Sequence, residues 1–196
     1  MTKRIFDICF SLTGLIILSP FILLISILII LTMPGRIFFI QPRIGRNGRA
    51  FKLFKFRTMK RSSSRIENAF NPGDKCRITL VGGFLRKYKL DELPQFINVL
   101  IGDMSVVGPR PETAEWIKAY PEKWEVILKV RPGITDNASI EFRNEEKLLS
   151  ASSNPYKVYR DEILPKKLNY YLEYVNHNTF TGDLQIILQT VKIIFS

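Results

Sequence analysis

The sequence is poor in the residues that build metal and redox sites. In 196 residues it has one histidine, His177, and two cysteines, Cys9 and Cys76. The cysteines lie in an apolar and a polar segment, and no cysteine–histidine spacing typical of metal binding is present. His177 has no serine or cysteine partner at a recognisable spacing. These absences argue against a disulfide framework, a zinc site and a hydrolase triad, and they favour a reduced, cytoplasmic-side environment.

Acidic residues are also few relative to basic ones. Lysine and arginine number 29 against 18 aspartates and glutamates, which gives a formal net charge of +11. Such an excess indicates an anionic partner: nucleic acid, an anionic bilayer or a phosphorylated substrate. Nucleic acid is the weakest of these, because the basic residues form no aromatic-interleaved module or recognition helix. The length suits one buried globular domain rather than two.

Charge is scarce at the start of the chain. Between Ile5 and Met33 the single charged residue is Asp7, and the run LIILSPFILLISILIILTM is apolar except for a few hydroxyls and Pro20. The segment exceeds the roughly 20 residues that a bilayer crossing needs. A secretory signal would have a shorter apolar region followed by a small-residue cleavage site. We therefore expect a membrane segment rather than a cleaved signal.

Two topologies remain open for this segment. Basic residues flank both of its ends, so the positive-inside rule places both ends in the cytoplasm. Ser19-Pro20 lies near the middle, where proline removes an amide donor and the serine hydroxyl can satisfy part of the freed backbone. Proline-kinked spanning helices are common, but only a re-entrant helix-break-helix segment, residues 1–34, satisfies both flanks. The flanking residues are Lys3 and Arg4 before the segment and Arg36, Arg43, Arg46 and Arg49 after it.

Residues 35–196 are predicted to form a catalytic domain on the cytoplasmic face of the membrane. Two β-prone runs flank Asn47-Gly48, and this pair favours a hairpin because both turn residues tolerate positive φ. Residues 61–76 are polar and turn-rich, which is typical of a flexible loop. Helical spacing dominates the remainder. The predicted fold class is therefore α+β, mainly helical with a small β-hairpin, in a monotopic membrane protein.

Several helices can be placed from spacing and capping signals. A short helix is expected after Gly82-Gly83, and another from Asp91, as its N-cap, to Gly102. Pro94 falls in the first turn of that second helix, where its missing amide costs little. Residues 182–195 form an amphipathic pattern that can either pack on the core or lie on the membrane as an interfacial helix.

The adjacent carboxylates Asp91 and Glu92, in KYKLDELPQF, have two interpretations. Acids are preferred at helix starts, so the pair can be simply a cap and a first-turn acid. Helical neighbours point about 100° apart, so the two do not face each other as acid and base. A catalytic pair would instead divide the work, with one carboxylate attacking and the other holding a cation. The pair alone does not decide between these interpretations.

Proline-held arginines are the candidates for phosphate binding. Arg110 lies between Pro109 and Pro111, whose fixed backbone would let its guanidinium grip a phosphate through two parallel hydrogen bonds. Arg131 precedes a Pro-Gly pair in a similar way. Asp103, in GDMS, is either a turn residue or a supporting group. Each cation can also be an ordinary solvated charge. The other basic candidates are Lys55, Arg57 and Arg86.

Three ordered fragments resemble a known family. KFRTM, LDELPQFINVLIGDMSVVGPRPE and VRPGIT resemble, in order and spacing, the bacterial sugar transferases known as small monotopic phosphoglycosyl transferases. The N-terminal apolar run is similar to their membrane segment, including its Ser-Pro break. The match runs from about Lys3 to Thr135, with a weaker echo towards the C-terminus. Because the series of motifs is long and ordered, the resemblance is specific.

The resemblance implies a membrane enzyme with a defined reaction. Members of this family transfer a sugar-1-phosphate from a UDP-sugar to a polyprenol phosphate, such as undecaprenyl phosphate, and release UMP. They start the synthesis of bacterial glycoconjugates such as capsule, O-antigen or glycoprotein glycan. The implied location is the bacterial inner membrane, with the active site on the cytoplasmic face and an anionic bilayer as partner.

The resemblance also implies roles for individual residues. Asp91 would attack the β-phosphate and become a phospho-sugar ester, while Glu92 would assist with Mg²⁺; both carboxylates are the metal candidates. Arg110 and the other basic candidates would bind phosphates. Ser19 and Pro20 would form the break that returns the helix to the cytoplasmic face.

One departure and one rival hypothesis bear on this assignment. After VRPGIT many family members continue with Gly-Trp-Ala-Gln, whereas here Asp136 and Asn137 replace the glycine and the tryptophan. This region would shape the sugar or uridine pocket, so no sugar identity is carried over. The rival hypothesis is a non-catalytic adaptor held at the membrane by the N-terminal segment and a basic face. It predicts vesicle binding that is independent of Asp91 and Glu92, and the ordered motifs disfavour it.

Overall fold

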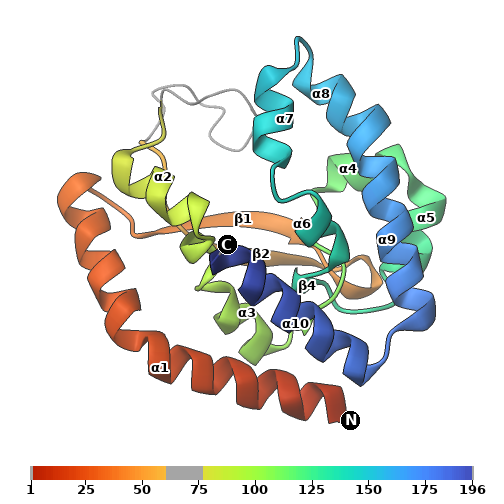
Figure 1. Cartoon of the computed structure of the whole chain (residues 1–196), viewed down its shortest axis with the longest axis horizontal. Helices are drawn as coiled ribbons and strands as arrows, with labels where there is room; N and C mark the ends of the chain where they lie inside the picture. The colour runs from red at the N-terminus through yellow and green to blue at the C-terminus, as the bar shows by residue number, and fades with distance from the viewer. Residues whose placement is uncertain (1, 61–76, 196) are drawn as a thin grey trace.

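A computed structural model describes residues 2–60 and 77–195. The loop expected at residues 61–76 lies outside the described residues. In Figure 1 the long helix α1 follows the lower and left margins, a β-hairpin crosses the middle, and most later helices gather on the right. The described part is mostly helical with a small antiparallel hairpin, which confirms that much of the predicted fold class.

Helix α1, Thr2–Thr32, continues through Pro20 without interruption, but it bends about midway along its length (Figure 1). Proline at position 20 cannot donate to the carbonyl of Ile16, one turn earlier, and such a loss is a common cause of helix kinks. The hydroxyl of Ser19 donates to that same carbonyl at 2.8 Å. The Ser-Pro pair therefore makes a bend in one helix rather than a gap between two.

The N-terminal turns of α1 are fixed to the folded domain by charged side chains. Asp7, 2% exposed, accepts hydrogen bonds from the hydroxyl of Ser105 and the amide of Val106. Lys3 forms an ion pair with the buried Asp183 of helix α10, Phe180–Phe195. Buried charges are usually retained where they are paired. These contacts therefore fix the position of the first turns of α1 on the folded domain.

The C-terminal turns of α1 are fixed by apolar packing. Ile25, Ile29 and Met33 are buried together with Phe56 of the hairpin and Leu85 of helix α2. Both ends of α1 therefore contact the same folded domain, and its middle section lies between these two attachments.

The hairpin confirms the Asn-Gly prediction. Strands β1, Phe38–Ile44, and β2, Ala50–Phe56, pair antiparallel across the 3₁₀ turn η1, Arg46–Gly48. Asn47 and Gly48 have φ of 58° and 74°, the positive values that these residue types tolerate.

Helix α2 corrects one expected boundary. It spans Leu80–Lys87 and begins at Thr79, whose side chain accepts the amide of Gly82, so the two glycines lie inside it rather than before it. A Cβ on Gly82 would lie 2.0 Å from the carbonyl oxygen of Thr58. Glycine is therefore required here for close packing of the helix on the chain that follows β2, not for ending a loop.

Helix α3, Gln95–Ile101, ends at Gly102 as predicted, with φ of 97° in the left-handed region. Its buried residues include the polar Gln95 and Asn98, while the apolar Ile97 and Ile101 are exposed. In an ordinary surface helix the apolar side chains are buried and the polar ones are exposed, so these four residues show the opposite pattern. Exposed apolar side chains of this kind suit a side of the helix that faces a membrane.

A second, parallel pair of strands was not predicted. Strand β3, Ser105–Val107, pairs with β4, Gly133–Thr135. A Cβ on Gly133 would lie 2.1 Å from the amide nitrogen of Gly108, so the two segments touch backbone to backbone. This close approach joins the loop after β3 to the loop before β4.

The remaining helices form the right-hand part of Figure 1 and enclose a core of Trp116, Trp124, Leu164, Leu168 and Tyr171. These elements are α4 (Ala114–Ala119), α5 (Pro121–Ile127), α6 (Asn137–Glu141), α7 (Glu145–Ala151), α8 (Pro155–Val158), the π-helical turn η4 (Tyr159–Ile163) and α9 (Leu164–His177).

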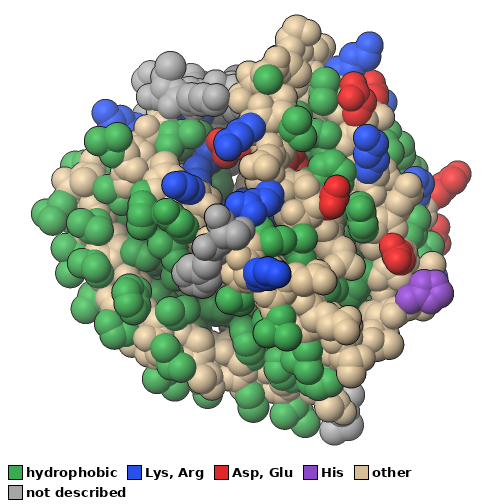
Figure 2. Space-filling model, in the orientation of Figure 1, with side chains coloured by type: hydrophobic (Ala, Val, Ile, Leu, Met, Phe, Trp, Pro, Cys, Tyr) green, Lys and Arg blue, Asp and Glu red, His purple; other side chains and the backbone are tan. Residues whose placement is uncertain are grey.

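The outer surface is apolar over α1 and part of α10. Among the described residues, α1 is the one helix long and apolar enough to cross a membrane, and 11% of its most apolar window is buried. In Figure 2 hydrophobic side chains cover the left and lower margins of the molecule. Leu188 and Val191 of α10 are 69% and 48% exposed. A patch of this extent indicates association with a membrane.

The attachment at Asp7 can be tested by mutation. We expect Asp7→Ala to lower the free energy of unfolding by about 1–3 kcal/mol, because it leaves the Ser105 hydroxyl and the Val106 amide buried without a partner. Thermal unfolding of the detergent-purified protein measures this. Cys9→Ala is the matched control, since Cys9 is exposed on the same helix. Equal melting temperatures for the two variants would contradict the assignment.

Candidate active site

Asp91 and Glu92 lie in a 3₁₀ turn, η3, Leu90–Glu92, which joins α2 to α3. The N-cap prediction for Asp91 was wrong: Pro94 occupies the N-cap position of α3, and Lys89, with φ of 56°, starts the turn. The physical reason is that the left-handed Lys89 reverses the chain before the helix begins. Both carboxylates are buried, at 8% and 7% exposed.

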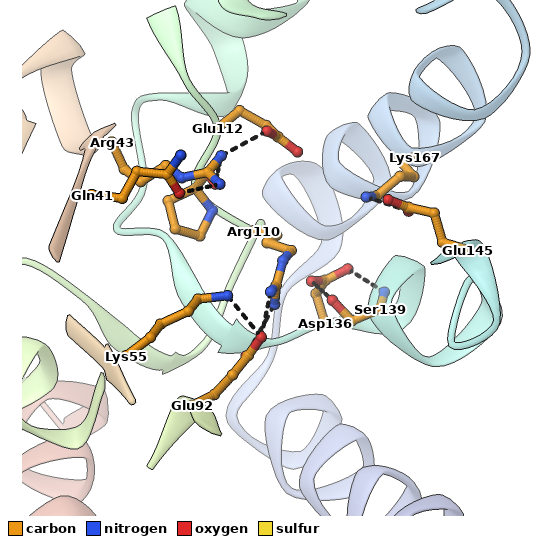
Figure 3. A network of polar contacts seen from close by, with 11 residues as sticks. Gln41, Arg43, Lys55, Glu92, Arg110, Glu112, Asp136, Ser139, Glu145 and Lys167 are labelled. Carbon is orange, nitrogen blue, oxygen red and sulfur yellow. Dashed lines mark hydrogen bonds and ion pairs between the residues drawn. The ribbon is translucent and has the colours of Figure 1, made fainter. Parts of the chain in front are cut away.

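Glu92 is held by two cations from other parts of the chain (Figure 3). Lys55 Nζ lies 3.0 Å from Glu92 Oε1, and the guanidinium of Arg110 donates to both carboxylate oxygens at 2.5 and 3.2 Å. Burial raises the pKa of Glu92, but the charges of Arg110 and Lys55 together outweigh it and hold that pKa well below its ordinary value. Glu92 is thus a fixed anion.

Asp91 is in the opposite situation. Its Oδ1 is buried and has no hydrogen-bond partner among the described residues. Burial, and then the charge of Glu92, raise the pKa of Asp91 above its ordinary value. A carboxylate with a raised pKa is a better nucleophile once ionised, because its charge is not neutralised by donors. The pair therefore consists of a saturated carboxylate beside an available one.

Lys55 is positioned by a residue that the sequence analysis missed, Asn98. The fully buried Asn98 side chain donates to the carbonyl of Lys52 at 2.7 Å and accepts from the amide of Phe54 at 3.0 Å. It thereby fastens β2 to α3, the helix that begins at Gln95, three residues after η3 ends at Glu92. A polar residue within an apolar helical run was the available sequence signal.

Arg110 is positioned by the loop between its prolines. The carbonyl of Pro109 accepts the amide of Gly133, and the carbonyl of Pro111 accepts Arg43 Nη1 at 3.4 Å. The amide of Ile44 donates to the carbonyl of Glu112 at 3.0 Å. The prolines and these contacts hold the loop from both sides, as the flanking prolines had suggested.

Glu112 and Arg43 form a second buried ion pair that was not proposed as part of the site. Arg43 Nη1 lies 3.0 Å from Glu112 Oε2, and the hydroxyl of Tyr159 donates to Glu112 Oε1 at 2.6 Å. Gln41 completes the group through a 2.9 Å contact to Arg43 (Figure 3). Glu112 follows Arg110 by two residues, so this network helps to fix the backbone of the loop that carries Arg110, the phosphate-binding candidate.

The other predicted cations have different surroundings. Arg86 lies near enough for its charge to oppose the rise in the pKa of Asp91, and its Nη1 lies 2.9 Å from Glu146. Arg57 donates to the carbonyl of Met33 at the end of α1. Arg131 Nε donates to the carbonyl of Gly102. The structure thus brings Arg86 to Asp91, whereas Arg57 and Arg131 contact helix ends, and their phosphate-binding roles stay predictions.

Asp103 and Asp136 lie around this centre without joining it. Asp103 follows Gly102 in a partly exposed turn, as one of its two interpretations expected. Asp136, the departure from the family pattern, is 2% exposed and caps α6 by accepting the amide and hydroxyl of Ser139. Figure 3 places its side chain beside Arg110. The departure therefore lies at the edge of the candidate site.

Two carboxylates are the available ligands for a metal ion. No group of three or more histidine, cysteine, aspartate or glutamate side chains within residues 2–60 and 77–195 could hold one. Mg²⁺ is usually held by one or two carboxylates together with substrate phosphates. The free Oδ1 of Asp91 suits that mode, and Glu92 could contribute by exchanging one of its cationic partners.

Comparison with known sequences identifies the family. The family model described as bacterial sugar transferase matches residues 1–196. The chain belongs to the bacterial sugar transferase family. This confirms the resemblance carried by the Asp-Glu, Gly-Asp-Met-Ser and Pro-Arg-Pro motifs.

Named relatives of this bacterial sugar transferase act on undecaprenyl phosphate or support polysaccharide production. The exopolysaccharide production protein ExoY of Sinorhizobium fredii is 34% identical, over 99% of this chain and 85% of its own length. The UDP-glucose:undecaprenyl-phosphate glucose-1-phosphate transferase of Escherichia coli is 36% identical, over 97% of this chain and 39% of its own.

A third relative carries a different sugar in its name. It is the UDP-N-acetylgalactosamine-undecaprenyl-phosphate N-acetylgalactosaminephosphotransferase of Aeromonas hydrophila, 31% identical over 99% of this chain and 44% of its own length. The chain thus spans less than half of the Escherichia coli and Aeromonas hydrophila relatives and most of the Sinorhizobium fredii relative.

The contrast between the two carboxylates predicts opposite effects on stability. We expect Glu92→Gln to destabilise the protein by about 3–5 kcal/mol, because Lys55 and Arg110 lose their shared anion while still partly buried. Asp91→Asn should leave stability unchanged or raise it, because ionised Asp91 has no donor at Oδ1. Thermal unfolding at neutral pH compares the two variants.

The pH dependence of this contrast follows from the raised pKa of Asp91. Protonated Asp91 is favoured by the folded state, so its contribution to stability is present at low pH and is lost as pH rises through the raised pKa. The melting temperature of Asp91→Asn, compared with that of the unmutated chain, should therefore rise as the pH increases from the ordinary pKa of an aspartate through the raised pKa. A lower melting temperature for Asp91→Asn throughout that range would contradict the unpaired state of Asp91.

Proposed function

We propose that this chain is a phosphoglycosyl transferase that moves a sugar-1-phosphate from a UDP-sugar to undecaprenyl phosphate and releases UMP. The observation that carries the proposal is the buried, unpartnered Oδ1 of Asp91 beside a Glu92 saturated by Lys55 and Arg110. Relatives with undecaprenyl-phosphate transferase names support the substrate classes. The reaction would begin a bacterial glycoconjugate such as capsule or exopolysaccharide.

In the first step Asp91 attacks the β-phosphorus of the UDP-sugar. A bond forms between a carboxylate oxygen and phosphorus, the bridging P–O bond breaks, and UMP leaves with that bridging oxygen and its electron pair. The product on the enzyme is an aspartyl phospho-sugar ester. Arg110, Lys55 and Arg86 are the cations placed to stabilise the phosphate charge, and such stabilisation supplies most of the catalysis in phosphoryl transfer.

In the second step the phosphate of undecaprenyl phosphate attacks the same phosphorus. An oxygen of the lipid phosphate forms the new P–O bond, and the Asp91 carboxylate leaves with its electron pair. The lipid diphosphate sugar is released and Asp91 is regenerated. Splitting the transfer in two lets a single buried carboxylate serve two different phosphate substrates.

We also propose that the reaction uses Mg²⁺ held by Asp91, Glu92 and the phosphates of the UDP-sugar. Bound Mg²⁺ neutralises charge that develops on the transferred and leaving phosphates. The chain's own contribution is to keep Glu92 ionised through Arg110 and Lys55, so that a carboxylate is available at neutral pH. Removal of the metal with a chelator should therefore stop UMP release while leaving the fold intact.

For topology we propose a re-entrant α1, with residues 35–196 on the cytoplasmic face of the inner membrane. The support is that both ends of α1 contact one folded domain, through Asp7 at one end and through Ile29 and Met33 at the other. A domain on one side of a bilayer cannot hold both ends of a helix that spans it. The bend between these attachments gives the helix the shape of a loop dipped into the membrane (Figure 1).

The chemical proposal is tested with purified protein, Mg²⁺, undecaprenyl phosphate and a panel of UDP-sugars. We expect UMP release with at least one donor and, without the acceptor, a single stoichiometric burst of UMP. Asp91→Asn should abolish both, by at least about 10³-fold, because no other described carboxylate in the site is free. Full turnover by Asp91→Asn would overturn the covalent role, and acceptor binding without any UMP release would favour the adaptor hypothesis.

The topology proposal is tested by cysteine labelling. In a chain with Cys9 and Cys76 replaced by serine, single cysteines are introduced at Thr2 and Arg36. We expect both to resist a membrane-impermeant thiol reagent added to intact cells and to react after the cells are opened. Labelling of the residue 2 cysteine in intact cells would establish a spanning helix instead.

A further inference from the structure

One face of helix α2 is apolar, exposed and ends in a cation. Leu80, Gly83, Phe84 and Lys87 follow the i, i+3, i+4, i+7 spacing that places residues on one side of a helix. Leu80 is 96% exposed and Phe84 57% exposed. A Cβ on Gly83 would meet only a methyl group of Ile78, at 3.9 Å, so the space between the two apolar side chains is open.

This face is held outward by packing on the other side of the helix. Leu85 is 2% exposed in the cluster that includes Ile29 and Met33 of α1. A Cβ on Gly82 would lie 2.0 Å from the carbonyl oxygen of Thr58, so this side of the helix packs closely on the chain that follows β2. The core side of α2 is therefore already occupied by Leu85, and Leu80 and Phe84 do not belong to the core. The exposure of these two apolar side chains needs another explanation.

The face leads from the membrane helix to the candidate nucleophile. The opposite side of α2, through Leu85, packs against the C-terminal part of α1 (Figure 1). At the end of α2, the chain runs from Lys87 through Tyr88 and Lys89 directly into the turn of Asp91. The ring of Tyr88 lies 4.9 Å from that of Phe84, and Lys87 Nζ lies 5.1 Å from the Tyr88 ring. Apolar, aromatic and cationic groups thus follow one another towards Asp91.

We propose that this face, Leu80, Gly83, Phe84 and Lys87, is the docking site for the acceptor lipid, with the first isoprene units on Leu80 and Phe84 and the phosphate near Lys87. A ligand that is apolar along its length and anionic at one end matches a surface that is apolar along its length and cationic at one end. Helix α2 packs on α1, whose outer surface is apolar, so the face lies near the place where such a lipid would enter from a bilayer. The inference rests on the proposed function and assigns the surface for its second substrate.

The test compares Leu80→Ser/Phe84→Ser and Lys87→Gln with the unmutated chain. The matched control is Leu188→Ser, an apolar residue on α10 whose exposure, 69%, lies between those of Leu80 and Phe84. UMP release is measured against undecaprenyl phosphate and against citronellyl phosphate, a soluble acceptor of two isoprene units. Co-flotation with vesicles of phosphatidylglycerol and phosphatidylethanolamine measures membrane binding separately.

We expect the double variant to raise KM for both acceptors by about tenfold or more, the effect of losing about 1.4 kcal/mol of apolar contact. KM for the UDP-sugar and the acceptor-free UMP burst should not change. Lys87→Gln should raise KM for both acceptors and weaken its dependence on salt. Weaker flotation with an unchanged KM for citronellyl phosphate would overturn the proposal, because the face would then contact only the bilayer.

A binding measurement keeps this inference separate from the proposed function. Titration calorimetry with citronellyl phosphate should show about tenfold weaker binding to the double variant than to Leu188→Ser. If the unmutated chain releases no UMP from any donor, the proposed function fails, but this comparison still decides the docking site. Equal affinities for the two variants overturn the docking site even if the enzyme is active.

Discussion

The site is organised by one electrostatic constraint: Lys55 and Arg110 lie beside each other, both partly buried, and the buried Glu92 is the anion that both of them share. Lys55 comes from the hairpin, Arg110 from the loop after β3, and Glu92 from the turn between α2 and α3. Without Glu92 the two cations would repel each other in a poorly solvated place. The ion pairs therefore join three segments that lie far apart in the sequence.

The same constraint separates the chemistry of the two neighbouring carboxylates. Because Glu92 takes up the nearby cations, its pKa falls well below the ordinary value, whereas burial and the charge of Glu92 raise the pKa of Asp91. Paired acids whose environments move their pKa values apart commonly have different roles. Here Glu92 is a fixed anion and Asp91 has a buried oxygen without a hydrogen-bond partner, which is consistent with the covalent role proposed for Asp91.

Around this centre, buried polar groups fix the backbone of the segments that carry the site residues. Asn98 fastens the strand that carries Lys55, and the Arg43–Glu112 pair supports the loop that carries Arg110. The membrane attachment uses the same principle, since Asp7 bonds directly to β3, the strand that precedes the Arg110 loop. The position of α1 is therefore coupled to the position of Arg110, the proposed phosphate-binding residue.

How much could be predicted from the sequence follows from the range of each interaction. Local signals determined the apolar helix, the Asn-Gly hairpin, the end of α3 at Gly102 and the family motifs, because each depends on a few neighbouring residues. Burial could not be deduced locally, so Asp91 was expected to be a helix cap, and Asn98 and Glu112 were missed. The sequence by itself determined that Asp91 and Glu92 are adjacent. Only the tertiary structure decided which of them is free, because the two cations that distinguish them arrive from residues 55 and 110.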